Sequence, residues 1–239
     1  MPDIITIGEL LIDFTAQTDK NGETVYKQNA GGAPANVAVM SSKLGVSSGF
    51  IGKIGKDMFG KYLKDVLDSF NVNTDSLIMD EENATTLAFV KNDPNGERDF
   101  VFYRKNSADQ NLKYSEVKLK LIDSCKIFHF GALSLTSEPL RTAAITAAEY
   151  AKSKGKIISY DPNWRPALWE SREEAEQIMR SVLHICDIIK VSEEELLIVT
   201  DSGNLLTAVS KLLNQGISIV CITQGAKGCI VATKHGIER

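Results

Sequence analysis

The sequence has little of what marks membrane-embedded or nucleic-acid-binding proteins. Lys and Arg number 27 against 31 Asp and Glu, which gives a net charge of −4 with no basic block. This balance argues against nucleic acid or an anionic membrane as the main partner. No apolar run approaches the roughly 20 residues of a membrane span, and Met1 to Ile7 lacks the basic lead-in of a signal peptide. We therefore expect a cytoplasmic protein.

Cysteine and histidine are also scarce. No Cys-x-x-Cys pair occurs, and no two histidines have the helical spacing of metal ligands. The residues concerned are Cys125, Cys186, Cys221, Cys229, His129, His184 and His235. We expect the cysteines to be small apolar side chains in a reducing compartment rather than disulfides or metal ligands. The histidines are expected to have core or surface roles.

What the sequence does contain is an alternation of apolar strands and amphipathic helices. Strands are predicted at 4–7, 49–54, 127–130, 156–160, 188–191 and 218–223. Helices are predicted at 33–44, 59–70, 138–153, 175–186 and 204–213. Fully apolar strands between helices are typical of a mostly parallel sheet with helices on both faces. The 239 residues are therefore expected to form a single α/β domain, with ligands at the carboxyl ends of its strands.

Two regions, 14–29 and 85–104, interrupt this alternation and show no helical period. The second contains a strong turn signal, Asn92-Asp93-Pro94-Asn95-Gly96, between two segments with strand character, which predicts a β-hairpin. We expect the two regions to form a small separate sheet. The alternative is a hairpin at the edge of the main sheet.

The segment Gly31-Gly32-Ala33-Pro34-Ala35-Asn36 combines two glycines with the start of a helix. Glycines allow the backbone to approach a ligand closely, and helix N-terminal N–H groups bind oxygen-rich ligands. Asn36 donates to and accepts from hydroxyl groups. Asp13, which follows the first strand, is able to accept two neighbouring sugar hydroxyls. The competing interpretations are an ordinary tight loop and a turn-capping aspartate.

Two further segments have the composition of a polyol site. In 98–104, alternation puts Arg98, Phe100, Phe102 and Arg104 on one face, so that rings cover a sugar's C–H surface and Arg104 binds its oxygens. The alternative is a solvated strand with ordinary cross-strand pairs. Asp161-Pro162-Asn163-Trp164-Arg165-Pro166 is stiffened by two prolines, which suits a residue that must hold its position, Asn163 or Arg165; a structural turn competes.

Gly55 to Tyr62 has the spacing of a phosphate-binding Walker loop. Tyr62, however, stands where Ser or Thr must hold magnesium, and the segment carries the apolar stripe of a helix. We interpret it as the start of a helix with no nucleotide role.

Two late segments follow predicted strands. Ser192 and Glu195 form a capping box in one interpretation; in the other, Glu195 lies near magnesium-bound phosphate. The second segment, Thr223-Gln224-Gly225-Ala226-Lys227-Gly228, suits either a hairpin or backbone contacts to a nucleotide phosphate.

The order of these motifs along the chain resembles the ribokinase-like (PfkB) sugar kinases. Gly8-Glu9-Leu10-Leu11-Ile12-Asp13 and 98–104 are most similar to bacterial fructokinases, with 2-keto-3-deoxygluconate kinases as near relatives. The resemblance implies a three-layer Rossmann-like core and a β-sheet lid formed by 14–29 and 85–104. It implies a sugar held by Asp13, Gly31, Gly32, Asn36, Phe102, Arg104 and Arg165. It implies ATP near Lys190, Ser192, Thr223, Gly225 and Gly228.

The resemblance further implies ATP-dependent phosphorylation of D-fructose to fructose 6-phosphate, with Mg²⁺ organised through Glu195, K⁺ as a further ion, and a homodimer paired through the lid. The alternatives are another family substrate, such as 2-keto-3-deoxygluconate, and a non-catalytic sugar-binding module. The family's Gly-Ala-Gly-Asp signature, which supplies the anion hole and catalytic base, does not occur before Arg239. We therefore expect no catalytic base in these residues, and little activity from them alone.

Overall fold

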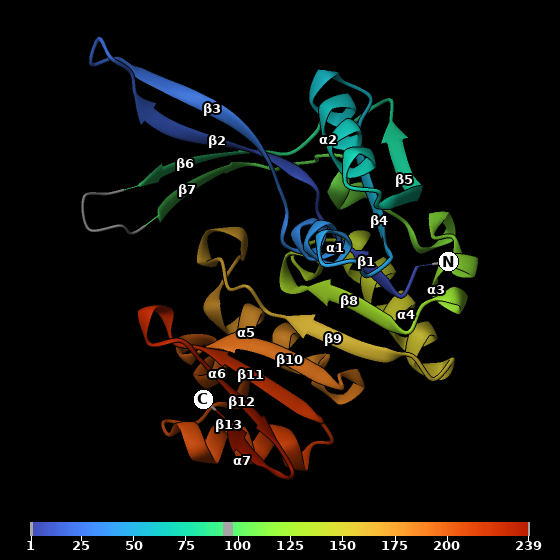
Figure 1. The fold of residues 1–239 in the computed structure, drawn as a ribbon, viewed down its shortest axis with the longest axis vertical. Coiled ribbons are helices and arrows are strands. Elements are labelled where there is room, and N and C mark those ends of the chain that lie inside the picture. Colours follow the sequence, from blue (N-terminus) through green and yellow to red (C-terminus); the bar gives the residue numbers. More distant parts are fainter. Residues whose placement is uncertain (1, 93–97, 239) are drawn as a thin grey trace.

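A nine-stranded sheet forms the centre of the computed structural model, which describes residues 2–92 and 98–238 (Figure 1). Its strand order is β13-β12-β11-β10-β9-β8-β1-β4-β5. The strands are β1 (Ile4–Ile7), β4 (Ser48–Gly55), β5 (Asn73–Asp80), β8 (Ile127–Gly131), β9 (Ile157–Asp161), β10 (Ile188–Ser192), β11 (Ile219–Thr223), β12 (Cys229–Thr233) and β13 (Gly236–Glu238). Neighbours are parallel except at β12 and β13, which confirms the predicted mostly parallel α/β fold.

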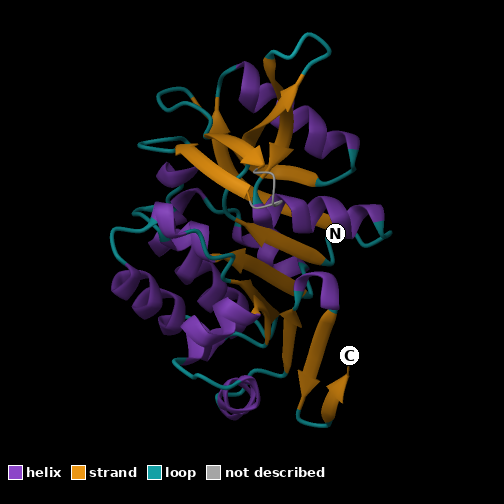
Figure 2. Ribbon diagram, turned by 90° about the vertical axis from the view of Figure 1, so that its left-hand side faces the viewer, coloured by secondary structure: helices purple, strands orange, loops and turns teal. Residues whose placement is uncertain are grey.

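Helices pack on both faces of this sheet at its β1–β4 end. Phe50 belongs to the apolar cluster formed with α1 and α2, whereas its neighbour Ile51 belongs to the cluster formed with α4. Adjacent residues of a strand point to opposite faces, so these helices form separate layers. The helices are α1 (Ala33–Lys43), α2 (Met58–Ser69), α3 (Leu119–Ser124), α4 (Leu140–Ser153), α5 (Arg172–Ser181), α6 (Glu193–Thr200) and α7 (Leu205–Asn214). Figure 2 shows the layers edge-on.

A second sheet of four strands projects from the large one, in the order β3-β2-β6-β7 (Figure 1). Its strands are β2 (Leu11–Thr18), β3 (Thr24–Gly31), β6 (Leu87–Asn92) and β7 (Arg98–Tyr103). The prediction of a small separate sheet is therefore confirmed, and the alternative of an edge hairpin is wrong. The predicted turn at 92–96 lies almost wholly outside the described residues.

The Walker-like segment is the start of α2, as predicted. The helix begins at Met58, and the Asp57 carboxylate caps it by accepting the Gly60 N–H at 2.7 Å. Leu63 and Leu67 on its inner stripe are buried. The spacing of the two glycines thus reflects a capped helix rather than a phosphate loop.

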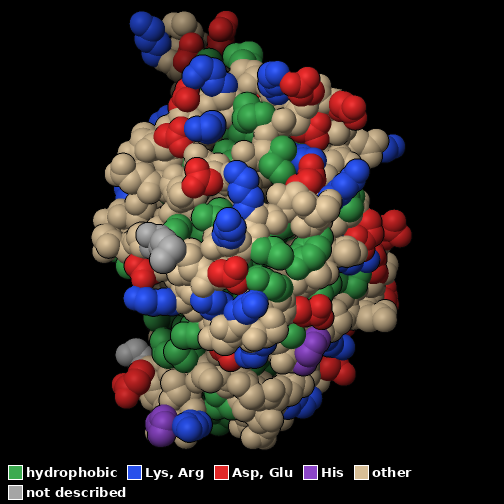
Figure 3. All heavy atoms as spheres, turned by 90° about the vertical axis from the view of Figure 1, so that its right-hand side faces the viewer, with side chains coloured by type: hydrophobic (Ala, Val, Ile, Leu, Met, Phe, Trp, Pro, Cys, Tyr) green, Lys and Arg blue, Asp and Glu red, His purple; other side chains and the backbone are tan. Residues whose placement is uncertain are grey.

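The surface in Figure 3 mixes Lys and Arg with Asp and Glu instead of gathering one sign of charge. All four cysteines are free thiols, and Cys125 and Cys186 are buried. Within the described residues, no helix is by itself long and apolar enough to cross a bilayer; α6 and α7 reach that length and composition only as a pair bent by 56°.

Candidate sugar and nucleotide site

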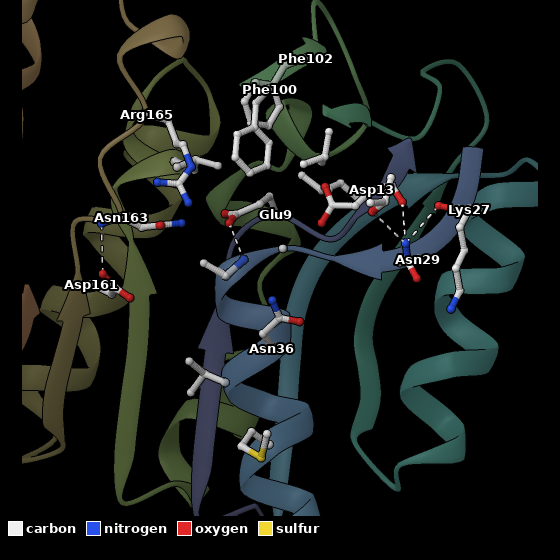
Figure 4. Close-up of a pocket in the computed structure, with 18 of the residues that line it drawn as sticks. Glu9, Asp13, Lys27, Asn29, Asn36, Phe100, Phe102, Asp161, Asn163 and Arg165 are labelled. Atoms are coloured by element: carbon white, nitrogen blue, oxygen red, sulfur yellow. Dashed lines mark hydrogen bonds between the residues drawn. The ribbon is translucent and has the colours of Figure 1, made fainter. Parts of the chain in front are cut away.

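A polar pocket of about 730 Å³ lies between the small sheet and the carboxyl edge of the large one (Figure 4). This volume is in the range of ordinary small-molecule sites. Five of the seven residues predicted to contact substrate line it: Asp13, Gly32, Asn36, Phe102 and Arg165. They come from β2, the start of α1, β7 and the loop after β9. The structure therefore brings together residues that are more than 150 positions apart in the sequence.

The two glycines of the 31–36 segment are required by close approaches. A Cβ on Gly31 would lie 2.3 Å from Oδ2 of Asp13, so this glycine is packed against the carboxylate although it does not line the pocket. Gly32 has φ of 112°, and a Cβ there would lie 2.3 Å from the carbonyl oxygen of Glu9. The chain then enters α1, which carries Asn36 in its first turn. The Gly31 backbone thus lies directly against the Asp13 carboxylate, and Gly32 lets the chain pass Glu9 and enter α1.

Aromatic rings from the small sheet cover one side of the pocket. Phe100 and Phe102 stack with centroids 5.7 Å apart, and the Arg165 guanidinium lies over the Phe100 ring at 5.3 Å. This cation–π contact joins β7 to the loop after β9. Figure 4 shows all three side chains at the same end of the pocket. The Arg98 side chain, predicted for the same face, lies outside the described part of the chain.

Arg104 does not line the pocket. Its Nε donates to Asp109 at 2.8 Å, Nη1 to the Thr136 hydroxyl at 2.8 Å and Nη2 to the Leu133 carbonyl at 3.1 Å. The physical reason is that β7 ends at Tyr103, and the alternation that would align Arg104 with Phe102 holds only within a strand. The guanidinium is instead buried at the base of the small sheet.

Sequence reasoning missed five polar residues of the pocket: Glu9, Thr15, Gln17, Lys27 and Asn29. Asn29 is the cross-strand partner of Asp13, and its side-chain amide donates to the Thr15 hydroxyl at 3.2 Å. Alternation along 24–31 was a usable signal for Lys27 and Asn29. Glu9 gave none, because it lies in a connection between strands. Burial raises the pKa of its carboxyl to about 7.

The predicted nucleotide residues lie at the same edge of the large sheet, beside the pocket. The Lys190 ammonium is 3.2 Å from the Asp161 carboxylate, which lines the pocket. Burial raises the pKa of Asp161, while the Lys190 charge opposes this rise. Ser192 and Thr223 are paired across β10 and β11. Lys190 therefore connects Asp161 in the pocket wall to the predicted nucleotide residues at the ends of β10 and β11.

The turn that follows β11 exposes backbone to solvent. Gly225 and Gly228 have φ of 57° and 92°, and a Cβ at either would meet no atom within 4 Å. These glycines are therefore needed for backbone conformation rather than for packing. Open space beside a glycine backbone leaves room for a phosphate.

Glu195 forms the predicted capping box. Oε2 accepts the Ser192 N–H at 2.7 Å, and Oε1 accepts the Trp164 N–H at 2.7 Å. The carboxylate thus fastens the 161–165 loop to α6. Both oxygens are engaged, the residue is buried, and the described residues contain no cluster of three or more Asp, Glu, His or Cys side chains placed to hold a metal. Glu195 thus has a structural role, and the prediction that it organises Mg²⁺ stays a prediction.

Fold and pocket together define a doubly wound α/β protein with a polar small-molecule site at its strand ends. The model of the pfkB family of carbohydrate kinases matches residues 1–238. "Probable fructokinase-6, chloroplastic" from Arabidopsis thaliana is 43% identical over 248 residues, which cover 99% of this chain and 65% of that protein. The chain belongs to the pfkB family of carbohydrate kinases.

Solved structures agree with this assignment. Fructokinase from Xylella fastidiosa superposes with a TM-score of 0.90 at 31% identity, covering 100% of this chain and 75% of that one. Fructokinase from Vibrio cholerae O395 in fructose, ADP and calcium ion bound form gives a TM-score of 0.88 at 31% identity, with 100% and 75% coverage. The predicted resemblance to bacterial fructokinases and the predicted fold are thereby confirmed.

Proposed function

We propose that this chain carries the sugar site and part of the nucleotide site of an ATP-dependent fructokinase, which converts D-fructose to fructose 6-phosphate. The observation that carries the proposal is the single pocket formed by Asp13, Asn36, Phe102 and Arg165. The three fructokinases described above support fructose as the sugar, and the structure of one of them contains bound fructose and ADP. Because the chain spans 65% of the length of the Arabidopsis relative, the activity of the whole protein is part of the proposal.

In this proposal the residues act mainly by positioning. Asp13 and Asn36 hold neighbouring hydroxyls, Arg165 binds a ring or anomeric oxygen, and the rings of Phe100 and Phe102 cover the C–H surface. The terminal hydroxyl then points toward the Lys190 side of the pocket, where the γ-phosphate of ATP lies for in-line transfer. Closure of the small sheet as a lid excludes water, which would otherwise accept the phosphoryl group.

We assign ATP to Lys190, Ser192, Thr223, Gly225 and Gly228. Mg²⁺ enters as part of the nucleotide substrate, held by phosphate oxygens and water. Glu195 acts on this site through the two backbone N–H groups that it fixes. K⁺ is a further ion of the whole protein in this assignment.

The four free thiols suit a reducing compartment, which we take to be the cytoplasm. The mixed surface charge suits small-molecule partners rather than nucleic acid or membrane.

Calorimetry with D-fructose, alone and then with a non-hydrolysable ATP analogue, tests this function. We expect fructose to bind the 239-residue chain and the analogue to bind in its presence. The protein that carries this chain is expected to phosphorylate fructose faster than ribose or 2-keto-3-deoxygluconate in a coupled assay. Fructose binding without any nucleotide binding or turnover would instead identify a non-catalytic sugar-binding module. Absence of fructose binding would refute the sugar assignment.

We also propose that two copies pair through the outer faces of their small sheets. This face carries an aromatic cluster in which Phe89 contacts Phe14, Tyr26 and Tyr103 at centroid distances of 5.1, 5.3 and 5.6 Å. Tyr26 and Tyr103 remain 52% and 64% exposed. Exposed aromatic surface of this kind is favourable for association. The opposite face of the sheet lines the pocket, so pairing leaves the pocket open.

The Tyr103→Lys substitution tests this pairing. We expect a homodimer in sedimentation equilibrium, and a dissociation constant raised about tenfold or more by the buried charge. Leu206→Lys on the exposed side of α7 makes the same charge change at an exposed apolar residue away from the small sheet and serves as the control. A wild-type protein that remains monomeric at high concentration would contradict the pairing.

A further inference from the structure

Glu9 has an arrangement that the proposed function leaves unexplained. It lies in the connection between β1 and β2, is 0% exposed and contributes to the wall of the sugar pocket (Figure 4). Its Oε1 accepts the Ala33 N–H at 2.9 Å, at the start of α1. Its Oε2 is buried and has no hydrogen-bond partner. One oxygen is thus committed to the fold, and the other is not.

An unpaired carboxylate oxygen is costly to bury, and buried polar atoms are nearly always hydrogen-bonded. Arg104 is the cation that acts on Glu9 electrostatically, yet its N–H groups are directed to Asp109, Thr136 and the Leu133 carbonyl. Arg104 therefore favours the negative charge of Glu9 without supplying the missing hydrogen bond. A hydrogen-bond donor to Oε2 must therefore be a group other than Arg104.

The pocket offers that partner. We propose that Oε2 of Glu9 accepts a hydrogen bond from a hydroxyl of the bound sugar, so that Glu9 is a second carboxylate contact of the site beside Asp13. Glu9 and Asp13 line the same pocket, so a sugar seated in it lies beside both carboxyl groups. The inference rests on the proposed function and extends it, because two carboxylates on different elements read two different hydroxyls of a polyol.

This contact has a consequence for protons. The carboxyl of Glu9 is raised in pKa to about 7, chiefly by burial; Arg104 opposes the rise and Asp109 adds to it. A sugar hydroxyl that donates to Oε2 stabilises the ionised carboxylate and so lowers this pKa. Near neutral pH, fructose binding therefore releases protons, and affinity falls as the pH drops below about 7 because binding must then first deprotonate Glu9.

The test is calorimetric titration of the 239-residue chain with D-fructose at about pH 6 and about pH 8, in buffers of different ionisation enthalpy. The wild type is expected to release protons near pH 7 and to bind more weakly at the lower pH. In Glu9→Gln the side-chain oxygen still accepts the Ala33 N–H, but an NH₂ group replaces Oε2. This variant should bind fructose about tenfold more weakly or worse, with no proton release. Glu149→Gln, an exposed change on α4, is the matched control.

A panel of monodeoxyfructoses separates a sugar contact from a purely structural role. If Glu9 accepts a hydrogen bond from one sugar hydroxyl, removal of that hydroxyl weakens sugar binding by the wild type. The same removal leaves sugar binding by Glu9→Gln nearly unchanged. If Glu9 only fixes Ala33, the variant weakens every sugar of the panel by the same factor, and the inference is overturned. The proton count is measured on the wild type, so it decides the question even if the variant folds poorly. Fructose binding without proton release would overturn the inference alone, whereas no fructose binding at all would refute the proposed function.

Discussion

Replacement of Asp13 by alanine is expected to weaken fructose binding at least about a hundredfold, because two hydrogen bonds to a charged group are lost and each contributes about 1.5–3 kcal/mol. Asp13 lies on the pocket side of β2, and Gly31 has no side chain where its carboxylate is packed. The loss should appear in calorimetric affinity rather than in stability.

Asp65→Ala is the matched control for this substitution, because Asp65 is an exposed aspartate on α2 whose ion pair with Lys61 is solvated. It should leave the affinity for fructose unchanged. An Asp13→Ala protein that binds fructose within about threefold of the wild type would show that the sugar lies elsewhere, since a factor of three is well under 1 kcal/mol.

Arg104→Met is expected to lower the free energy of unfolding by about 3–5 kcal/mol, because it leaves Asp109 as an unpaired charge in the interior. The side chains of Arg104 and Asp109 are 3% and 1% exposed, and their closest atoms are 2.8 Å apart. Asp109 also accepts hydrogen bonds from the Thr86 and Ser107 hydroxyls. An unpaired Asp109 charge therefore also disturbs the hydrogen bonds of Thr86, which directly precedes β6. Urea denaturation measures the effect.

The comparison is Arg172→Met, which removes an exposed ion pair with Glu176 on α5 and should cost no more than about 0.5 kcal/mol. If Arg104→Met kept its stability and lost only fructose binding, Arg104 would contact the sugar directly, as the alternation of 98–104 suggested. Loss of both would follow from the structural role alone, since the small sheet that carries Phe102 depends on this anchor.

The fold was predictable where hydrophobic pattern and local chemistry agree. The buried strands, such as Ile4–Ile7, are predominantly apolar runs, and α2 carries its apolar stripe directly behind a capping aspartate. Both are local signals that survive in any tertiary context. The strand β5 (Asn73–Asp80) was missed because it is an edge strand of largely polar composition that is only partly buried. Its strand conformation comes from pairing with β4 rather than from its own residues.

The candidate site was predictable in outline for a different reason. Asn36 and Arg165 stand at a helix start and after a strand end, where parallel topology gathers ligand-binding residues. Asp13 instead reaches the pocket from within β2 of the small sheet. The residue at which a strand ends could not be predicted from the sequence. Because β7 ends at Tyr103, Arg104 leaves the side of β7 that lines the pocket. Glu9 was missed because only the folded chain shows that one of its oxygens is buried without a partner.

A crystal structure of this chain with D-fructose is the most direct test of the central claim, which is that distant segments form one sugar site. The account predicts fructose in the pocket of Figure 4, with its hydroxyls within hydrogen-bond distance of Asp13, Asn36 and Arg165 and its C–H surface on Phe102. Fructose bound on another surface, with these four side chains still facing solvent, would contradict it.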